Sequence, residues 1–255
     1  MNDEVPVHRT TRSIRTYKPR RGRVTERQAR GIAVGSAYLL DPEMPVVEQW
    51  RPSGDLVMEI GFGTGDSVAM MALADPQTSI LAVDIHTPGI GDLLARIVDD
   101  GLSNIRVISG DALDVLGSGL EKDSLLGVRL FFPDPWPKMR HHKRRLVSAE
   151  NVDLIASRVR PGGFWHLATD WAPYADWMRR ILDASPMWRG GEIDRPRSRP
   201  ITRYERIAIS QGRKVVDLLY TRTTTRADRG SPPSSLSTSA TPTRTGDPDL
   251  DTPDR

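Results

Sequence analysis

The chain has 255 residues, a formal net charge of +3 and no cysteine. The lack of cysteine excludes disulfides, thiolate metal sites and a cysteine nucleophile, and it fits a reducing compartment. No apolar run reaches the length of about 18 residues that a membrane helix needs, and the basic N-terminus lacks the apolar segment of a secretory signal. We therefore expect a cytoplasmic protein of one or two domains, without a membrane partner.

Basic residues gather in two separate segments of the chain. Residues 1–30 are rich in arginine, and residues 138–145 are almost wholly basic. Two such clusters indicate a nucleic-acid partner more strongly than a high isoelectric point does. A solvated tail would give the same pattern in the first segment, and the sequence leaves that alternative open.

Composition divides the chain into three parts. Residues 1–30 are expected to form a basic flexible arm, because they contain few large apolar side chains. Residues 224–255 are mainly Ser, Thr, Pro and Asp, so we expect a disordered tail that cannot bury enough surface to offset its ordering entropy. The folded domain is expected to span residues 31–223, of which 31–54 form a transition.

Within the folded domain, short apolar runs alternate with segments of helical spacing. Such alternation predicts an α/β fold whose sheet is mostly parallel and carries helices on both faces. Ligands of such sheets bind at the carboxyl ends of the strands. A final antiparallel hairpin is predicted from Ile201–Ile209 and Val215–Tyr220. The other predicted strands are 56–60, 80–83, 105–108, 128–132 and 164–168, and the predicted helices are 66–74, 89–100, 144–158 and 174–182.

A glycine-rich loop follows the first of these strands. Gly61, Gly63 and Gly65 allow a sharp turn and the close approach of a ligand to the backbone. A dinucleotide fingerprint would require Gly or Ala at the next position, where Asp66 instead places a negative charge against a pyrophosphate. Together with Glu59, this charge suits a cationic ligand, such as the amino group of S-adenosylmethionine.

The next two strands each end near an acidic residue. Asp84 can accept hydrogen bonds from both hydroxyls of a ribose. Asp111 could accept from the amino group of an adenine, although an acid in a surface turn is an equally good interpretation. The glycine loop and the two acids together predict a binding site for S-adenosylmethionine.

The fourth predicted strand ends in an acid held between two prolines, and a tryptophan and several cations follow. Asp134 could bind the polar edge of a base, and Trp136 could stack on one. The cations fit contacts with RNA phosphates, which position a nucleic acid rather than read its sequence. His141 and His142 are adjacent, a poor metal geometry, so we expect no metal site. The expected phosphate contacts are Arg140, Lys143, Arg144 and Arg145.

Five motifs in this order resemble those of the bacterial single-subunit tRNA (guanine-N7)-methyltransferases. The resemblance covers about residues 55–222 and implies a Rossmann-like methyltransferase sheet with a reversed last strand. Residues 31–223 would then be the methyltransferase domain. The motifs are Glu59-Ile60-Gly61-Phe62-Gly63-Thr64-Gly65, His86-Thr87-Pro88-Gly89-Ile90-Gly91, Phe131-Phe132-Pro133-Asp134-Pro135-Trp136-Pro137-Lys138, Ala168-Thr169-Asp170-Trp171-Ala172-Pro173-Tyr174-Ala175 and Arg199-Pro200-Ile201-Thr202-Arg203-Tyr204-Glu205.

The resemblance also implies roles for individual residues. It places Glu59, Asp84, Asp111 and Asp134 in the S-adenosylmethionine site, with Asp134 also at the reacting centre as the catalytic residue. The implied partner is tRNA, with guanine 46 of the variable loop as the target. The implied substrate contacts are Lys138, Asp170, Thr202, Arg203, Tyr204 and Glu205.

The sequence departs from the family pattern in three places. Asp84 stands where Glu is usual, and Thr202–Glu205 reads Thr-Arg-Tyr-Glu in place of Thr-Lys-Phe-Glu. Residues 211–217 diverge from the usual run, so we assign no site residue there.

The chemistry of the implied reaction needs no general base. N7 of guanine carries a lone pair and no proton, so it can attack a sulfonium methyl group directly and in line. An acid beside the base can accept from N1–H and the exocyclic amine and can favour the shift of positive charge onto the ring. Asp134 and Asp170 are both candidates for that contact, and the sequence does not divide the role between them.

Two other functions remain open. An amino-methyltransferase of adenine or cytosine would use a related Asp-Pro-Pro-aromatic motif, but here Trp136 stands one place early. A non-catalytic RNA-binding module is opposed by the complete set of Glu59, the glycine loop, Asp84 and Asp134, and an oxidoreductase by Asp66. We expect a monomer or a weak homodimer.

Overall fold

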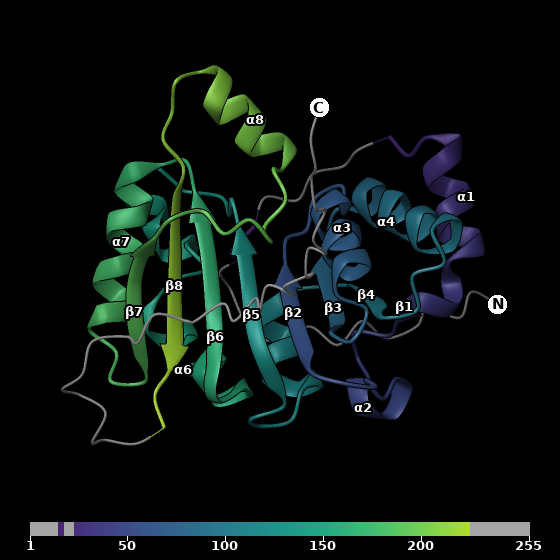
Figure 1. Cartoon of the computed structure of the whole chain (residues 1–255), viewed down its shortest axis with the longest axis horizontal. Coiled ribbons are helices and arrows are strands. Elements are labelled where there is room, and N and C mark those ends of the chain that lie inside the picture. Colours follow the sequence, from purple (N-terminus) through teal and green to yellow (C-terminus); the bar gives the residue numbers. More distant parts are fainter. Residues whose placement is uncertain (1–14, 18–22, 225–255) are drawn as a thin grey trace, which may run out of the picture.

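In a computed structural model that describes residues 15–17 and 23–224, the chain forms an eight-stranded sheet with helices on both faces (Figure 1). The strand order is β1-β4-β3-β2-β5-β6-β8-β7. All pairs are parallel except β6 with β8 and β7 with β8. The predicted α/β sheet with a reversed last strand is therefore confirmed.

The elements have the following bounds. The strands are β1 Leu39–Leu40, β2 Leu56–Ile60, β3 Ser79–Asp84, β4 Ile105–Ser109, β5 Leu125–Phe131, β6 Val159–Thr169, β7 Trp188–Ile193 and β8 Val216–Arg222. The α-helices are α1 Glu26–Val34, α2 Val46–Gln49, α3 Asp66–Ala74, α4 Thr87–Asp99, α5 Ala112–Asp114, α6 Ala149–Arg158, α7 Ala172–Asp183 and α8 Arg203–Ser210. Three other short helices are η1 Ser36–Tyr38, η2 Val115–Gly119 and η3 Met139–Arg144.

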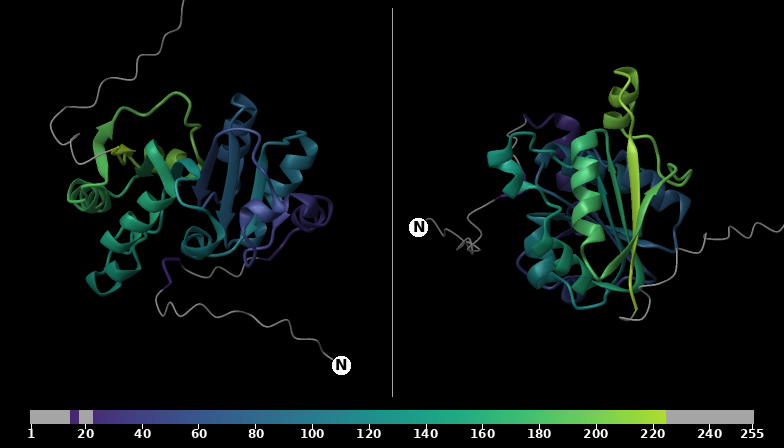
Figure 2. Two further views of the ribbon diagram at one scale, coloured as in Figure 1. Left: turned by 90° about the horizontal axis from the view of Figure 1, so that it is seen from below. Right: turned by 90° about the vertical axis from the view of Figure 1, so that its left-hand side faces the viewer.

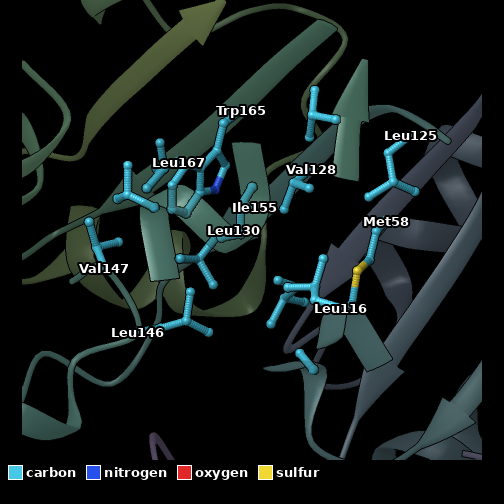
Figure 3. Close-up of a cluster of buried hydrophobic side chains, with 14 of the residues drawn as sticks. Met58, Leu116, Leu125, Val128, Leu130, Leu146, Val147, Ile155, Trp165 and Leu167 are labelled. Atoms are coloured by element: carbon cyan, nitrogen blue, oxygen red, sulfur yellow. The ribbon is translucent and has the colours of Figure 1, made fainter. Parts of the chain in front are cut away.

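The sheet separates two apolar cores, as the alternation of side chains along β3 shows. Leu81 and Val83 belong to the larger core, which packs against α6 and α7 and includes the side chains in Figure 3. Ile80 and Ala82 belong to the second core, beneath α3 and α4. Because successive side chains of a strand point to opposite faces, the continuous apolar run of β3 is buried on both sides.

The predicted C-terminal hairpin is wrong, because residues 203–210 form a helix. Thr202 caps α8 by accepting from the backbone N–H of Glu205 at 3.1 Å, and Glu205 and Ala208, one turn apart, are its buried residues. The true antiparallel neighbours of β8 are β6 and β7.

The folded region begins earlier than predicted. Thr25 and Gln28 form a capping box, so α1 starts at Glu26 inside the segment 1–30 that was expected to be a flexible arm. Helix α1 then packs closely on α4, where a Cβ at Gly31 would lie 2.1 Å from the carbonyl oxygen of Gly91. The predictions for residues 1–14, 18–22 and 225–255 lie outside the described residues.

The glycine loop and α4 fit together without room for a side chain. The loop ends at Gly65, whose φ of 74° makes it the left-handed N-cap of α3. A Cβ added at Gly89, in the first turn of α4, would lie 1.8 Å from the carbonyl oxygen of Gly63. The first turn of α4 therefore supports the loop from one side.

We predict that Gly89→Ala separates α4 from the glycine loop. The clash with a backbone atom cannot be relieved by a side-chain rotation, so the unfolding free energy should fall by about 1–3 kcal/mol and S-adenosylmethionine should bind more weakly. Thermal unfolding and calorimetry measure both effects. Gly191→Ala is the matched control, because a Cβ at Gly191 meets no atom within 4 Å. Equal stability and equal cofactor affinity of the two variants would contradict the view that α4 supports the glycine loop.

Candidate active site

The order of the strands reverses between β2 and β5. On one side of this point the strands follow in the order β2, β3, β4, and on the other side in the order β5, β6. Ligands of open α/β sheets bind outside the carboxyl ends of the strands at such a point. The glycine loop follows β2 and the Asp134 turn follows β5, so the two motifs meet there.

The carboxylate of Asp84 is tied to the backbone around it. One oxygen accepts from the N–H of Gly63 at 2.8 Å, and the other accepts from the N–H groups of Ile85 and His86 at 2.7 and 2.9 Å. These bonds link the end of β3 to the glycine loop. The oxygen that accepts from Gly63 has only this one bond and can accept a second, so the half-buried side chain can still receive a ribose hydroxyl.

Glu59 is a buried acid beneath the glycine loop. Its side chain is 1% exposed, and one oxygen accepts from the hydroxyl of Ser67 at 3.3 Å. The other oxygen, like Nη1 of Arg129 on the neighbouring strand, is buried and has no hydrogen-bond partner among the described residues. Burial raises the pKa of Glu59 to about 7, although Arg129 and Ser67 act to lower it. Two unsatisfied groups of opposite charge on neighbouring strands suit a polar ligand.

The Asp134 turn has an unusual backbone. Phe132 and Trp136, two residues on either side of Asp134, have φ values of 54° and 45°. Positive φ is uncommon for residues with side chains and is found disproportionately at functional sites. Phe132 is held by its N–H, which donates to the carbonyl of Ala168 at 2.7 Å. Asp134 itself is half-buried.

Trp136 does not offer a free face to a base, contrary to the prediction. Its side chain is 5% exposed, its Nε1 donates to the carbonyl of Thr16 at 3.1 Å, and the guanidinium of Arg144 lies 4.5 Å from its ring centre. The short described segment 15–17 thus packs against this motif. Burial, with a contribution from Asp111, raises the pKa of Tyr17 in the same segment. Asp111 also accepts from the N–H of Leu113 at 2.9 Å and caps α5.

Only part of the predicted basic surface is exposed. Lys138, Arg140 and Lys143 are exposed. Arg144 is half-buried on Trp136, and Arg145 is 3% exposed, with Nε donating to the carbonyl of Pro135 at 3.0 Å. Arg145 therefore supports the fold in this structure and does not present its charge to a phosphate.

Asp170 and α8 close the site from the other side. Asp170 follows β6 and pairs with Nη1 of Arg213 at 2.7 Å. A base that contacts this carboxylate must therefore share it with Arg213. The ring of Tyr204 reaches the glycine loop, because a Cβ at Gly63 would lie 3.9 Å from it. Arg203 and Tyr204 are exposed and Thr202 is half-buried as the cap of α8. Figure 2 shows α8 standing beyond the end of the sheet.

Glu205 is not available for a direct contact with RNA. Its side chain is 2% exposed and accepts from Nη1 and Nη2 of Arg199 at 2.6 and 3.1 Å. The same guanidinium donates to both oxygens of Asp217 in β8 at 2.7 Å, and His166 lies 2.8 Å from Asp217. Burial lowers the pKa of Arg199, but hydrogen bonds to Asp217 and Glu205 raise it overall. Glu205 therefore anchors α8 to the sheet.

Sequence reasoning missed the partners of these acids. Arg199 is part of a quoted motif, but its burial depends on residues far along the chain. Arg213 lies in the divergent segment 211–217, to which we assigned no site. Arg129 could have been noticed, because a lone cation inside the apolar run of β5 needs an acid on a neighbouring strand.

We predict that the Arg199 anchor contributes strongly to stability. Arg199→Ala removes the one buried cation that both carboxylates share, leaves them only Arg195 and His166, and should lower the unfolding free energy by about 3–5 kcal/mol. Arg195→Ala removes a more exposed partner of Glu205 and should cost about 1 kcal/mol or less. Arg199→Lys keeps the charge without the paired geometry and should fall between them. Equal losses in urea denaturation for the two alanine variants would refute the anchor.

Glu59 should give the unliganded protein an unusual pH dependence. Between its ordinary pKa of 4.5 and the folded value of about 7, the folded chain keeps a proton that the unfolded chain loses. The unfolding free energy should therefore fall as pH rises through this window, by up to about 3 kcal/mol from this group. Glu59→Gln should remove that part of the slope in denaturation from pH 5 to 8. An unchanged slope in the variant would contradict this account.

Comparison with known proteins identifies the family. A family described as "Putative methyltransferase" matches residues 53–218. The chain is 46% identical over 233 residues to a tRNA (guanine-N(7)-)-methyltransferase of Streptomyces avermitilis, a match that covers 88% of this chain and 80% of the relative. The relative of the same name from one Pseudomonas putida strain is 41% identical over 221 residues, covering 83% and 92%.

Solved structures agree with the observed fold. A 16S rRNA methyltransferase, KamB, superposes with a TM-score of 0.53 at 18% identity, covering 69% of this chain and 92% of that one. Such a low identity supports the Rossmann-like methyltransferase fold alone. On the family match and the close relatives, this chain belongs to the tRNA (guanine-N7)-methyltransferases, whose methyl donor is S-adenosylmethionine.

Proposed function

We propose that this enzyme methylates N7 of guanine 46 in the tRNA variable loop, with Asp134 at the reacting centre. This assignment of residues rests mainly on one observation. The glycine loop and the Asp134 turn both follow strands at the point where the strand order reverses. The glycine loop allows the close approach of a ligand, and the Asp134 turn holds an acid between two residues of positive φ. A cofactor and a base can therefore be brought together at this point.

The residues around the glycine loop fit S-adenosylmethionine. Glu59 has a buried oxygen with no partner among residues 15–17 and 23–224, which suits the ammonium group, and Arg129 suits the carboxylate of the same amino-acid end. Asp84 would receive the ribose, and Asp111 the adenine amino group. The bound cofactor supplies a methyl group activated by a positively charged sulfur. Gly61, Gly63 and Gly65 would let the backbone approach it.

The chain's contribution to the transfer is orientation and charge. No side chain needs to remove a proton from guanine N7. Asp134 would accept from N1–H and the exocyclic amine of the base, which orients N7 and favours guanine over adenine. The negative charge also stabilises the positive charge that develops on the ring. Asp170 is the second candidate for the base contact, and its pairing with Arg213 makes it the less available acid.

The exposed groups around this edge would hold the RNA. Lys138, Arg140 and Lys143 are positioned to bind phosphates, which set affinity and register. Arg203 and Tyr204 would approach the RNA from α8. We propose that the enzyme acts as a monomer or weak homodimer, in the cytoplasm. None of the helices in residues 15–17 and 23–224 combines the length and apolarity needed to span a membrane.

Asp134→Asn should separate catalysis from binding. The substitution keeps the size of the side chain but removes its charge, so single-turnover methyl transfer should slow about 100-fold or more. The dissociation constant for tRNA, which depends mainly on phosphate contacts, should change by about threefold or less. Asp153→Asn, an exposed acid on α6, is the control. Near-normal transfer by the Asp134 variant would remove this residue from the reacting centre.

Neutralising the exposed cations should reduce the salt dependence of tRNA binding. Changing Lys138, Arg140 and Lys143 together to Gln should make the slope of log Kd against log salt shallower by about 2, because each phosphate contact contributes about 0.7–0.9. The matched control neutralises the exposed Arg51, Lys122 and Arg160 at the amino edge of the sheet. If both triple variants have the wild-type slope, the basic segment does not touch phosphate.

A further inference from the structure

A cavity of about 380 Å³ opens beside the candidate active site, between η3 and the first turns of α7. Its walls include Pro137 and Trp171, which are the chain neighbours of Lys138 and Asp170. The cavity thus lies at the carboxyl edge of the sheet where the guanine is expected. Its volume is at the small end of the range of about 300–1,000 Å³ for ligand pockets. None of the side chains that line this cavity has a part in the proposed methyl transfer.

One wall of the cavity presents an exposed aromatic ring. Trp171 is 36% exposed, and it is the only exposed residue among the six tryptophans, all of which are described. Pro137 and Pro173 add two flat apolar surfaces around it. Aromatic rings exposed beside basic side chains are the usual platforms for unstacked nucleic-acid bases.

A second tryptophan forms a rigid wall. Nε1 of Trp177 donates to the carbonyl of Val147 at 2.7 Å. The guanidinium groups of Arg145 and Arg180 lie 4.8 and 4.6 Å from its ring centre, and the ring of His142 lies 5.5 Å away, edge to face. Because its surroundings are already filled, Trp177 holds the cavity open and leaves Trp171 as the ring for stacking.

The cavity also holds polar groups that a ligand could satisfy. Nε2 of His142 is buried and has no hydrogen-bond partner among the described residues. A buried ring nitrogen without a partner is unfavourable, and a turn of the ring toward the cavity would let this nitrogen pair with the edge of a base. Arg180 is exposed at the rim and can meet a phosphate, whereas Asp176, the acid of the lining, is paired with Arg179.

We propose that this cavity binds one unpaired nucleotide of the tRNA other than the methylated guanine. The base stacks on Trp171, its edge bonds to His142, and its phosphate lies at Arg180. A second base held beside the target would fix the register of the RNA and would select tRNAs whose loop can place it there. This inference rests on the tRNA substrate of the family but not on the role of Asp134.

The first test measures binding of an unmodified tRNA transcript that carries guanine 46. Trp171→Ala should raise Kd about tenfold, as expected for one lost stack, and Trp171→Phe should recover most of it. Arg180→Gln should also weaken binding, whereas Arg160→Gln, an exposed arginine at the other edge of the sheet, should not. The affinity for S-adenosylmethionine should stay unchanged in all of these variants, which separates loss of the site from loss of the fold.

The second test identifies the base. Transcripts with a single abasic nucleotide at each unpaired position of the variable loop are measured against the wild-type enzyme and Trp171→Ala. One position other than the target should cost the wild type about tenfold and the variant nothing further. Wild-type tRNA affinity in Trp171→Ala, or additive losses at every position, would overturn the proposal. Formation of 7-methylguanosine by the wild type on the intact transcript is measured in parallel, so a failure of the proposed target is distinguished from a failure of this pocket.

Discussion

The guanidinium of Arg199 is a full charge buried to 1% exposure, and two acids from different elements compensate it. Glu205 lies in the first turn of α8 and Asp217 belongs to β8, so the ion pairs join a helix at the mouth of the site to the reversed strand of the sheet. A buried charge is tolerated only when its partners are in place. The interaction therefore specifies one position for α8, and with it the position of Tyr204 over the glycine loop.

The rest of the site follows from the reversal of strand order between β2 and β5. That reversal separates the loops after the two strands and leaves space at the carboxyl edge of the sheet. The close fit of Gly89 under Gly63 and the bonds of Asp84 to the loop shape the proposed cofactor side. On the proposed substrate side, two residues of positive φ, Phe132 and Trp136, flank Asp134. The two sides come from separate motifs, and only the sheet brings them together.

The sequence predicted β2, β3, β4, β5, β6 and β8, the glycine loop and the acids at the strand ends, because local patterns of apolar and turn residues determine these features. It did not predict β1 and β7, which lie at the two edges of the sheet. Sequence-based prediction was wrong at positions whose burial depends on contacts with residues far along the chain. Residues 203–210 carry enough apolar side chains to resemble a strand, yet the cap by Thr202 and the burial of Glu205 make them helical. Arg145 and Glu205 resemble surface contacts in sequence but serve as internal supports, and the packing of segment 15–17 on Trp136 could not be read from either segment alone.

The central claim is that this site transfers a methyl group to N7 of one guanine in the variable loop of tRNA. The most direct measurement incubates the enzyme with S-adenosylmethionine and unmodified tRNA, digests the RNA with a nuclease of known specificity, and locates the added methyl group by mass spectrometry of the fragments. The account predicts a single 7-methylguanosine, at position 46. A methyl group on the amino group of adenine or cytosine, or a 7-methylguanosine elsewhere in the tRNA, would contradict it.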